Sequence, residues 1–448
     1  MTRTVRLLRW LDRLLLRLFF RRIEVEGADV LLDDRPRVLI ANHVSALVDA
    51  MVLFGTLPRI PRFLGKSTLW NIALLRPLLN GARVIPIYRR QDQVDMSRNA
   101  DTFARCHEVL AEGGTVALFP EGTSHNEPAL LPLKTGAARI VLAAEEKFGP
   151  LDLRVVPIGL IFDNKGKFRS RLLVRVGEEI DPLAIVADQA DDRAAVAALT
   201  ETLSRGLAEV TLNFDSWDQA QRIARAVEIF ERRDPDLPQG SELGRTFAAR
   251  RAFLSGYRKL VERYPERVAE VETAVAGYQA LLEESGLRDR QVAARYPLPS
   301  VSRHLLRSAF RMLVRLPVAM VGTLLNGLPY LAVSMIASRK SDEDQLATYK
   351  IFPALLVYPI AWLIEAAAAG FLWNGWAALG VALLAPLTGP GALRFHDDRT
   401  RLLSETRAFL KLGTRRGLAD ELRHRRGQVR QKVAEAVELY RAVYELET

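Results

Sequence analysis

The most constraining feature of this chain is an uncharged apolar stretch, LPVAMVGTLLNGLPYLAVSMIAS, at residues 316–338. As a helix it would be long enough to cross a bilayer, whose hydrocarbon core needs about 20 apolar residues. A second apolar region, residues 351–393, is broken by Glu365 and by the Gly/Pro-rich sequence APLTGPGAL. It could hold two spans, or one span and a re-entrant piece. The alternative is that both regions form buried helices of a soluble domain, although two such regions in succession are unusual for an ordinary core.

The first 22 residues, MTRTVRLLRWLDRLLLRLFFRR, predict a basic amphipathic helix. Arginines and leucines recur at helical spacing on two different faces: Arg6, Arg9, Arg13 and Arg17, against Leu7, Leu11, Leu14 and Leu18. Because arginines interrupt the apolar run and no small-residue cleavage site follows, a cleaved signal peptide is not expected. We therefore expect a retained helix lying in a lipid interface, the alternative being a surface helix packed on the core.

The charge of the chain indicates an anionic partner. The formal net charge is +10 and the isoelectric point is about 9.8. Arginines and lysines are concentrated beside the apolar regions rather than among exposed aromatic residues, which favours membrane lipids and argues against nucleic acid. Basic residues precede the first apolar region and follow the second, so both ends are expected in the cytoplasm. The single cysteine, Cys106, rules out an intrachain disulfide.

Between these regions, short apolar strands alternate with helical stretches. The strands include RVLIANH, RVIPIYR, TVALFPEG and RVVPIGLIF, and the helices include TGAARIVLAAEEKF. This alternation predicts an α/β domain with a mixed, largely parallel sheet, followed by an α-helical C-terminal region with membrane-embedded helices. The expected segments are an interfacial helix at 1–22, the α/β domain at 23–215, a polar helical accessory region at 216–300, a membrane-embedded region at 301–393 and a basic cytoplasmic tail at 394–448.

The sequence ANHVSALVDAM places His43 and Asp49 at opposite ends of an uncharged segment. Residues six apart do not meet on one continuous helix, so a turn must bring them together. If the strand ends near Asn42 and a helix begins near Ser45 as N-cap, Asp49 could reach one nitrogen of the imidazole. The other nitrogen would then be able to take a proton from a hydroxyl group. The alternative is a structural histidine that is hydrogen-bonded within the turn.

Other polar side chains follow neighbouring strands, where open α/β sheets place their ligands. The sequence FPEGTSH predicts a turn that contains Glu121 and Gly122, and VIPIYRR places two arginines that suit a phosphate directly after a strand. VVPIG is interpreted as a strand that ends in a proline turn. A metal site built from His43, Asp49 and His125 is a weaker alternative, because no metal-ligand spacing accompanies them.

Four blocks in this order resemble those of the glycerolipid acyltransferase superfamily. NHVSALVD resembles its catalytic His/Asp block, VIPIYRR its arginine block, FPEGTS its Pro-Glu-Gly block and VVPIG its proline block. The resemblance covers roughly residues 35–180. The downstream helices and apolar regions also look like those of the larger, multi-span glycerol-3-phosphate acyltransferases.

The resemblance implies a membrane-bound O-acyltransferase whose catalytic domain is on the cytoplasmic face. It would move an acyl group from acyl-CoA or acyl-carrier protein to glycerol 3-phosphate or lysophosphatidate, with the thioester as co-substrate and no cofactor. By this resemblance His43 is the general base and Asp49 orients it. The implied acceptor-binding residues are Arg89 as first choice for the phosphate, Arg90 as its rival, Glu121, Gly122 and Thr123 around the pocket, and Lys134, which is otherwise an ordinary solvated lysine.

One departure from the family pattern bears on the activity. The family usually has four residues between its histidine and aspartate, whereas five residues separate His43 from Asp49. An extra residue in the turn before the helix could preserve the contact. Two alternatives stay open at this point: a catalytically inactive membrane scaffold that retains the fold, and an acyltransferase that acts on another lipid acceptor.

Overall fold

The computed structural model describes residues 2–73, 75–89, 92–230, 241–293, 298–339 and 342–444. These residues form two compact units. The sheet unit contains Met1–Asn213, Ser241–Gly244 and Ser338–Ile351, and the helical unit contains Phe214–Gly240, Arg245–Ala337 and Phe352–Thr448. The sheet unit therefore includes a segment that lies far along the chain, between two long apolar helices.

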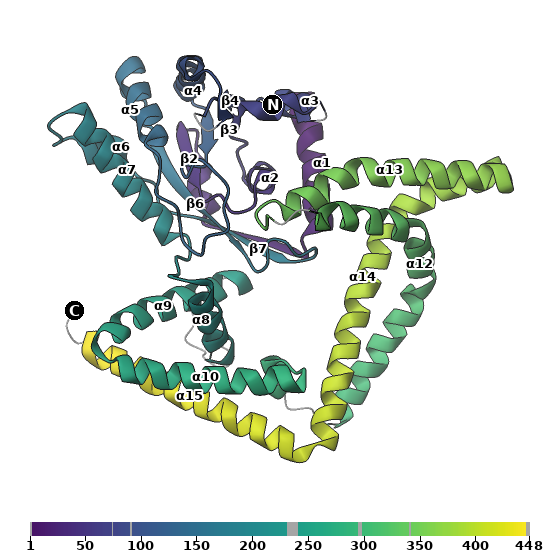
Figure 1. Ribbon diagram of the computed structural model, residues 1–448. Helices are drawn as coiled ribbons and strands as arrows, with labels where there is room; N and C mark the ends of the chain where they lie inside the picture. The colour runs from purple at the N-terminus through teal and green to yellow at the C-terminus, as the bar shows by residue number, and fades with distance from the viewer. Residues whose placement is uncertain are drawn as a thin grey trace. The chain divides into compact units, whose positions relative to one another are not determined.

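The described part of the sheet unit contains one sheet of seven strands in the order β1-β7-β6-β2-β5-β3-β4 (Figure 1). The strands are β1 (Arg22–Glu26), β2 (Arg37–Ala41), β3 (Arg62–Lys66), β4 (Ile85–Ile87), β5 (Thr115–Leu118), β6 (Arg154–Phe162) and β7 (Arg171–Val176). Every neighbouring pair is parallel except β6 and β7. The predicted mixed, largely parallel sheet is thus confirmed.

The sheet separates two hydrophobic cores, because successive side chains of a strand point to opposite faces. In β2, Leu39 and Ala41 join the core that contains residues of the first two helices, α1 (Arg3–Phe19) and α2 (Leu47–Thr56). Val38 and Ile40 join the core on the other face, formed with α4 (Asn99–Ala111), α5 (Gly136–Phe148) and α7 (Asp192–Glu209). Burying a Val, Leu or Ile side chain in these cores contributes about 1.5–3 kcal/mol. The helices of this unit are α1 (Arg3–Phe19), α2 (Leu47–Thr56), α3 (Leu75–Gly81), α4 (Asn99–Ala111), α5 (Gly136–Phe148), α6 (Pro182–Val186) and α7 (Asp192–Glu209).

The predicted N-terminal helix forms as α1, and its apolar residues serve two surfaces. Leu16 and Phe19 are buried in the core of the sheet unit, whereas Leu7 and Trp10 are 64% and 62% exposed. The role of α1 at a lipid interface remains a prediction. Leu7 and Trp10 are the side chains that would enter the lipid.

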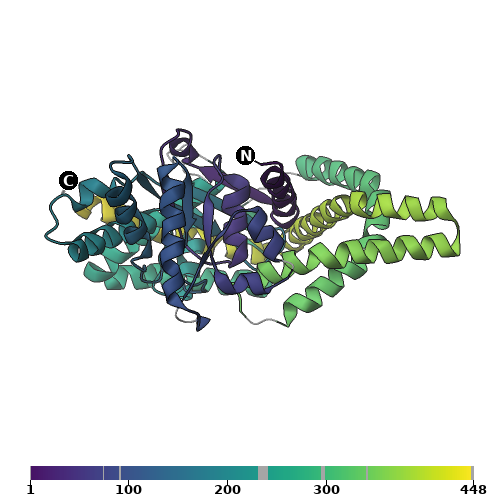
Figure 2. The same cartoon turned by 90° about the horizontal axis from the view of Figure 1, so that it is seen from above.

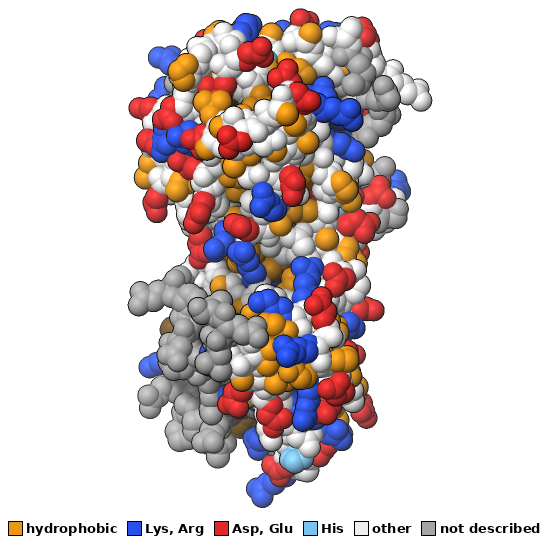
Figure 3. All heavy atoms as spheres, turned by 90° about the vertical axis from the view of Figure 1, so that its left-hand side faces the viewer, with side chains coloured by type: hydrophobic (Ala, Val, Ile, Leu, Met, Phe, Trp, Pro, Cys, Tyr) orange, Lys and Arg blue, Asp and Glu red, His pale blue; other side chains and the backbone are white. Residues whose placement is uncertain are grey.

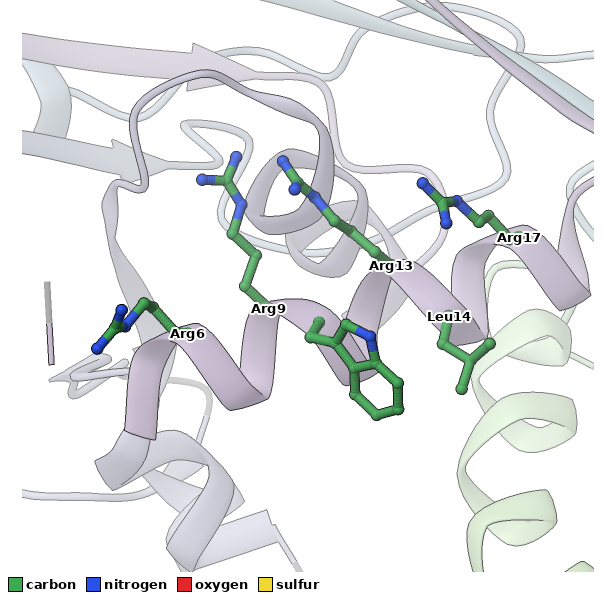
Figure 4. A pocket seen from close by; sticks show the side chains of 6 residues that line it. Arg6, Arg9, Arg13, Leu14 and Arg17 are labelled. Atoms are coloured by element: carbon green, nitrogen blue, oxygen red, sulfur yellow. The ribbon is translucent and has the colours of Figure 1, made fainter. Parts of the chain in front are cut away.

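The arginines of α1 form a row along the helix (Figure 4). Two of them are engaged by the next helix of the core. Arg9 donates a hydrogen bond to the carbonyl oxygen of Leu57, and Arg13 Nε donates to that of Gly55 at 2.8 Å. Both carbonyls lie at the C-terminal end of α2, where positive charge interacts favourably with the helix dipole. Arg9 and Arg13 therefore cap the C-terminal end of α2.

Asp12 is a buried carboxyl group between these arginines. It is 7% exposed, and its Oδ2 atom has no hydrogen-bond partner. Burial raises the pKa of Asp12 to about 8, while the charges of Arg9 and Arg13 oppose that rise. Between pH 4 and 8 the folded chain therefore holds a proton that the unfolded chain releases, so stability falls as the pH rises through this window.

We expect Asp12→Asn to stabilise the chain at pH 8 by ~2 kcal/mol or more, since each pKa unit corresponds to about 1.4 kcal/mol. At pH 5 the advantage of the variant should be much smaller, because most of the loss of stability lies above that pH. Thermal unfolding of the detergent-solubilised protein at both pH values measures the difference, with the exposed Glu201→Gln as control. A difference in Tm that is the same at both pH values would contradict the assignment.

The proline block does not end a strand as the sequence predicted. Pro157 lies inside β6, where it is the partner of Ile40 in β2, and the strand continues to Phe162. The missing N–H is tolerated because pairing of β6 with β7 begins only at Ile158. The carbonyl oxygen of Pro157 instead accepts a hydrogen bond from Gly177 N at 2.9 Å.

The helical unit is built from long helices. They are α8 (Trp217–Phe230), α9 (Glu242–Arg263), α10 (Pro265–Ser285), α11 (Asp289–Ala293), α12 (Leu298–Ser338), α13 (Leu346–Leu372), α14 (Gly375–Thr414) and α15 (Arg416–Tyr444). Helices α9 and α13 begin in the sheet unit and continue here. Helices α8, α10 and α15 share a core that includes Tyr278 and Leu422, both 0% exposed. The predicted polar helices of residues 216–300 thus pack on the basic C-terminal segment.

Three helices of the described chain are long and apolar enough to cross a membrane: Leu306–Ser338, Leu346–Leu372 and Gly375–Thr414. The second apolar region of the sequence is divided between α13 and α14, which run side by side in both views (Figures 1 and 2). Only 6% of the most apolar part of α13 is buried. Apolar helices with so little protein contact are typical of a lipid environment.

The surface shown in Figure 3 carries Lys and Arg side chains interspersed with Asp and Glu. The net charge of +10 is thus not gathered into one basic field on this face. Mixed charge of this kind is typical of solvated protein surface.

Candidate functional site

His43 and Asp49 meet at the C-terminal end of β2. His43 Nδ1 lies 2.9 Å from Asp49 Oδ2, and the Asp49 side chain is 0% exposed. The turn before them is held by Asn42, whose amide bonds both the N–H (2.7 Å) and the C=O (3.1 Å) of Leu160 in β6. The carboxylate thus fixes one ring nitrogen of a histidine that is itself 19% exposed.

The longer spacing between the two residues is taken up by the turn. Ala46 has φ +45° and ψ −126°, and α2 begins directly after it at Leu47. Such a backbone conformation is uncommon for a residue with a Cβ atom. The predicted role of Ser45 as N-cap is wrong, because its backbone N–H donates to Asp49 Oδ2 at 2.7 Å and Ala46 occupies the cap position. Asp49 therefore holds the turn and the imidazole with one oxygen atom.

Glu121 lies in the turn after β5, the strand beside β2, and its side chain is 0% exposed. Its Oε1 accepts a hydrogen bond from His43 N at 2.7 Å, and its Oε2 accepts one from Leu131 N at 2.8 Å. Oε2 also bonds His125 Nε2. Both oxygens are thus committed to protein partners, which positions the backbone of His43 from the neighbouring strand.

Two further contacts hold the histidine. Its ring stacks on Phe119, with centroids 4.1 Å apart and an angle of 11° between the planes. The carbonyl oxygen of His43 accepts a hydrogen bond from His125 N at 3.1 Å. In the described part of the chain, no three His, Cys, Asp or Glu side chains are grouped as ligands of one metal ion. The site is built to orient an imidazole.

Arg89 follows β4 and reaches the same turn. Its Nη1 donates to the carbonyl oxygen of Gly122 at 2.8 Å, and Nε and Nη2 donate to the two carboxylate oxygens of Asp92 at 2.8 and 3.0 Å. The Arg89 side chain is 23% exposed. Its neighbour Arg90 lies outside the described residues.

The remaining predicted binding residues surround Gly122. This glycine has φ +79°, a conformation that side chains rarely adopt, and a Cβ atom there would lie 3.4 Å from Lys134 Cγ. Lys134 is exposed, and its backbone N–H donates to Pro120 O at 2.7 Å. Thr123 is exposed, and its hydroxyl donates to the carbonyl oxygen of Ser124 at 3.3 Å. The turn thus presents Thr123 and Lys134 at the surface beside Arg89.

Sequence reasoning missed two contributors to this site. Lys165, just beyond β6, donates from Nζ to His125 O at 3.2 Å, and burial lowers the pKa of Lys165 although Asp344 and Asp49 raise it. Ser124 Oγ donates to Asp344 Oδ2 at 2.6 Å. Asp344 lies between α12 and α13, so nothing in the local sequence pattern links it to the turn after β5.

Comparison with known proteins covers most of the chain. Residues 22–161 match the family model described as Acyltransferase, and residues 235–441 match that of the glycerol-3-phosphate acyltransferase 2 C-terminal domain. Glycerol-3-phosphate O-acyltransferase 2 of Saccharomyces cerevisiae is 28% identical over 286 residues, which is 59% of this chain and 37% of the relative. Glycerol-3-phosphate O-acyltransferase 1 of the same yeast is 31% identical over 213 residues, 46% of this chain and 26% of the relative.

A human relative matches a shorter portion of the chain. The 1-acyl-sn-glycerol-3-phosphate acyltransferase alpha of Homo sapiens is 32% identical over 133 residues, which is 29% of this chain and 44% of that protein. The chain spans only 37% and 26% of the length of the two yeast relatives. Every candidate residue from His43 to Lys134 lies within the matched residues 22–161.

Proposed function

The chain belongs to the glycerolipid acyltransferase superfamily, and from that membership we propose that it moves a fatty acyl group from a thioester to a hydroxyl of a phosphorylated glycerol. The observation that carries the proposal is the contact of 2.9 Å between His43 Nδ1 and the buried Asp49 carboxylate. A carboxylate in this position orients the imidazole and stabilises the positive charge that it acquires as a base.

The reaction follows from this geometry. With Nδ1 held by Asp49, Nε2 of His43 takes the proton of the acceptor hydroxyl as its oxygen attacks the thioester carbonyl carbon. The tetrahedral intermediate then collapses, the C–S bond breaks, and the proton on His43 passes to the leaving thiolate. The products are an ester and a free thiol. The attacking oxygen comes from the substrate, so no nucleophilic side chain and no cofactor take part.

Glu121 acts as a positioning residue for His43 rather than as a ligand of the acceptor. Its carboxylate is fully buried and is bonded to His43 N and Leu131 N. A buried charge with these partners is costly to move, because each bond to a charged group is worth about 1.5–3 kcal/mol. We therefore place the acceptor on the exposed side of the turn, beside Thr123 and Lys134.

The acceptor phosphate is assigned to Arg89, with Lys134 as its second cation. Arg89 already bonds Gly122 O at 2.8 Å, so its guanidinium group lies at the turn. The pair with Asp92 pre-orients that group, and the planar fork suits phosphate oxygens. Arg90 stays the alternative.

Arg89→Ala is expected to raise the KM for the acceptor about tenfold or more, because a charge-assisted bond is lost, and to leave the KM for the donor unchanged. Steady-state kinetics with each substrate varied in turn measures both constants. The exposed Arg105→Ala on α4 is the matched control. Asp92→Asn, which keeps the arginine, should change the acceptor KM much less; an equal effect would mean that Arg89 acts only through the turn. An unchanged acceptor KM in Arg89→Ala would shift the role to Arg90 or Lys134.

We propose glycerol 3-phosphate as the acceptor, with lysophosphatidate as the second candidate. The match of residues 235–441 to the C-terminal domain of glycerol-3-phosphate acyltransferase 2 supports the first, and the human relative supports the second. The donor is acyl-CoA or acyl-carrier protein. We place the protein in a membrane with its catalytic domain on the cytoplasmic face, because basic residues flank the apolar helices.

The test is transfer of a labelled acyl group by the purified protein in detergent, with either acceptor and with both donors. We expect product from glycerol 3-phosphate. Product from lysophosphatidate alone would assign the second acylation. If neither acceptor yields product with either donor, the chain acts on another lipid acceptor or is an inactive scaffold, and vesicle flotation would then test lipid binding alone.

A further inference from the structure

The segment between α12 and α13 is part of the sheet unit. Ala347 and Ile351 are 0% and 4% exposed and belong to the same hydrophobic core as α1 and α2. Asn126 Nδ2 donates to Glu343 Oε2 at 2.8 Å, close to the bond between Ser124 and Asp344. The residues that follow α12 therefore contact the turn after β5. They lie on the same side of the membrane as the sheet unit.

The chain before α12 and the chain after α14 are also held together. Helices α10 and α15 pack along each other, and Arg426 Nε of α15 donates at 2.7 Å to Asp289 Oδ1 of α11. Tyr278 of α10 donates to the same oxygen at 2.9 Å. Water-soluble helices that share a buried core must lie on one side of a membrane. The chain before α12 and the chain after α14 therefore lie on the same side.

That face is the one occupied by the sheet unit. Every candidate span of the described chain begins at Leu306 or later. The ten residues at 231–240, ERRDPDLPQG, are too few and too charged to cross a hydrocarbon core. The chain then returns to the sheet unit, where Leu243 N donates to Glu24 Oε2 at 2.7 Å.

The chain therefore crosses the membrane an even number of times before the segment that joins α12 to α13, and an even number of times after it. The apolar half of α12, residues 316–338, starts and ends on the catalytic face, yet a helix of about 35 Å is long enough for one crossing only. It consequently makes none. Pro317 and Pro329 lie inside α12, at positions where a helix can bend.

The apolar half of α12 packs against the following helices. Asn326 Nδ2 donates to Ala385 O of α14 at 3.0 Å, and its Oδ1 accepts from Trp362 Nε1 of α13 at 3.1 Å. A Cβ atom at Gly322 would lie 2.5 Å from Thr388 O, so the two backbones approach closely. Small residues and satisfied amides of this kind join helices within lipid.

Helices α13 and α14 form a hairpin with the dimensions of a bilayer. Residues 352–372 and 375–393 extend about 31 Å and about 28 Å at 1.5 Å per residue. The turn carries Trp373 and Trp376, which are 72% and 81% exposed. Tryptophan is enriched where a helix meets the membrane surface. Apart from Glu365, residues 352–393 carry no charged side chain, and charged residues resume at Arg394, where the chain returns.

We propose that residues 352–393 form a hairpin that crosses the membrane twice, with its turn at Trp373–Trp376 on the face opposite the catalytic domain. The apolar half of α12, despite its length and hydropathy, enters and leaves through the catalytic face. This topology rests on the membrane insertion in the proposed function but not on the acyl transfer. It keeps Glu343 and Asp344, which bond the turn after β5, directly before the first span in the chain.

The topology can be tested by cysteine labelling in a Cys106→Ala background, since Cys106 is the single cysteine and is buried. Single cysteines replace Arg339 after α12 and Gly375 in the turn; Arg339 is exposed, and a Cβ atom at Gly375 meets nothing within 4 Å. The matched controls are cysteines in place of the exposed Glu201 of the sheet unit and Glu438 of α15. Sealed vesicles that expose the Glu201 position are treated with a membrane-impermeant maleimide.

We expect Arg339→Cys to label as fully as both controls and Gly375→Cys to label only after the vesicles are opened with detergent. Protection of Arg339→Cys in sealed vesicles would mean that α12 crosses, and would overturn the proposal. Labelling of Gly375→Cys in sealed vesicles would also overturn it. So would a Gly375→Cys thiol that stays unlabelled after the vesicles are opened but reacts once the protein is denatured. An inactive chain with the expected labelling would reject the acyl transfer and leave the topology standing.

Discussion

Replacing His43 with alanine is expected to lower kcat for acyl transfer by about 10²- to 10⁴-fold, the usual contribution of a positioned general base. The reason is the loss of the ring that Asp49 orients at 2.9 Å. Transfer of labelled acyl groups at saturating donor and acceptor measures the effect. The exposed His424→Ala on α15 is the matched control.

The His43→Ala protein should remain folded, because the backbone bond from His43 N to Glu121 Oε1 does not depend on the side chain. Thermal unfolding in detergent and association with membranes would verify this. A variant that is folded and has a kcat within about threefold of the wild type would remove His43 from the chemistry. The inactive-scaffold alternative predicts no turnover by the wild type and equal lipid binding by both proteins.

Asp49→Asn should produce a loss of similar size, about 10²- to 10⁴-fold in kcat, with little change in either KM. An amide of the same shape can still contact His43 and Ser45 N, but it brings no negative charge to stabilise the imidazolium. The side chain is 0% exposed, so water cannot replace that charge. Steady-state kinetics separates kcat from KM.

The control for Asp49→Asn is Asp101→Asn. Asp101 lies in the first turn of α4, as Asp49 lies in the first turn of α2, but it is exposed. Both changes remove one favourable charge from a helix N-terminus, an effect worth about 0.3–1 kcal/mol. If the two variants lose the same activity, the effect of Asp49 is one of helix stability and its role in orienting His43 is refuted.

Much of the candidate site could be predicted because its residues follow strands. His43 and Glu121 follow neighbouring parallel strands, and the carboxyl ends of such strands meet at one edge of the sheet. The meeting of His43 with Asp49 was predictable because only a turn and the start of a helix lie between them. The conformation that achieves it, with Ala46 at φ +45°, was not, since propensities favour Ser45 as the cap.

The remaining contacts depend on packing over long distances in the chain. Asp344 bonds Ser124 across 220 residues, and no periodicity or motif connects these positions. Pro157 was interpreted as the end of a strand because proline interrupts a sheet. Its tolerance inside β6 depends on where β7 stops pairing, which is a property of the assembled sheet.

The attachment of α1 to α2 bears on how the contact of the N-terminal helix with lipid could be weakened. Removing the N-terminal helix would be the natural way to weaken adhesion to lipid, since Leu7, Trp10 and Leu14 are its exposed large apolar residues. Yet Arg13 holds the last turn of the helix whose first turn carries Asp49, and Leu16 fills the core beneath it. Removing α1 would therefore expose the face of α2 that packs against it. The contact of this helix with lipid is better weakened by exchanging Leu7 and Trp10 for polar residues while the helix itself is kept.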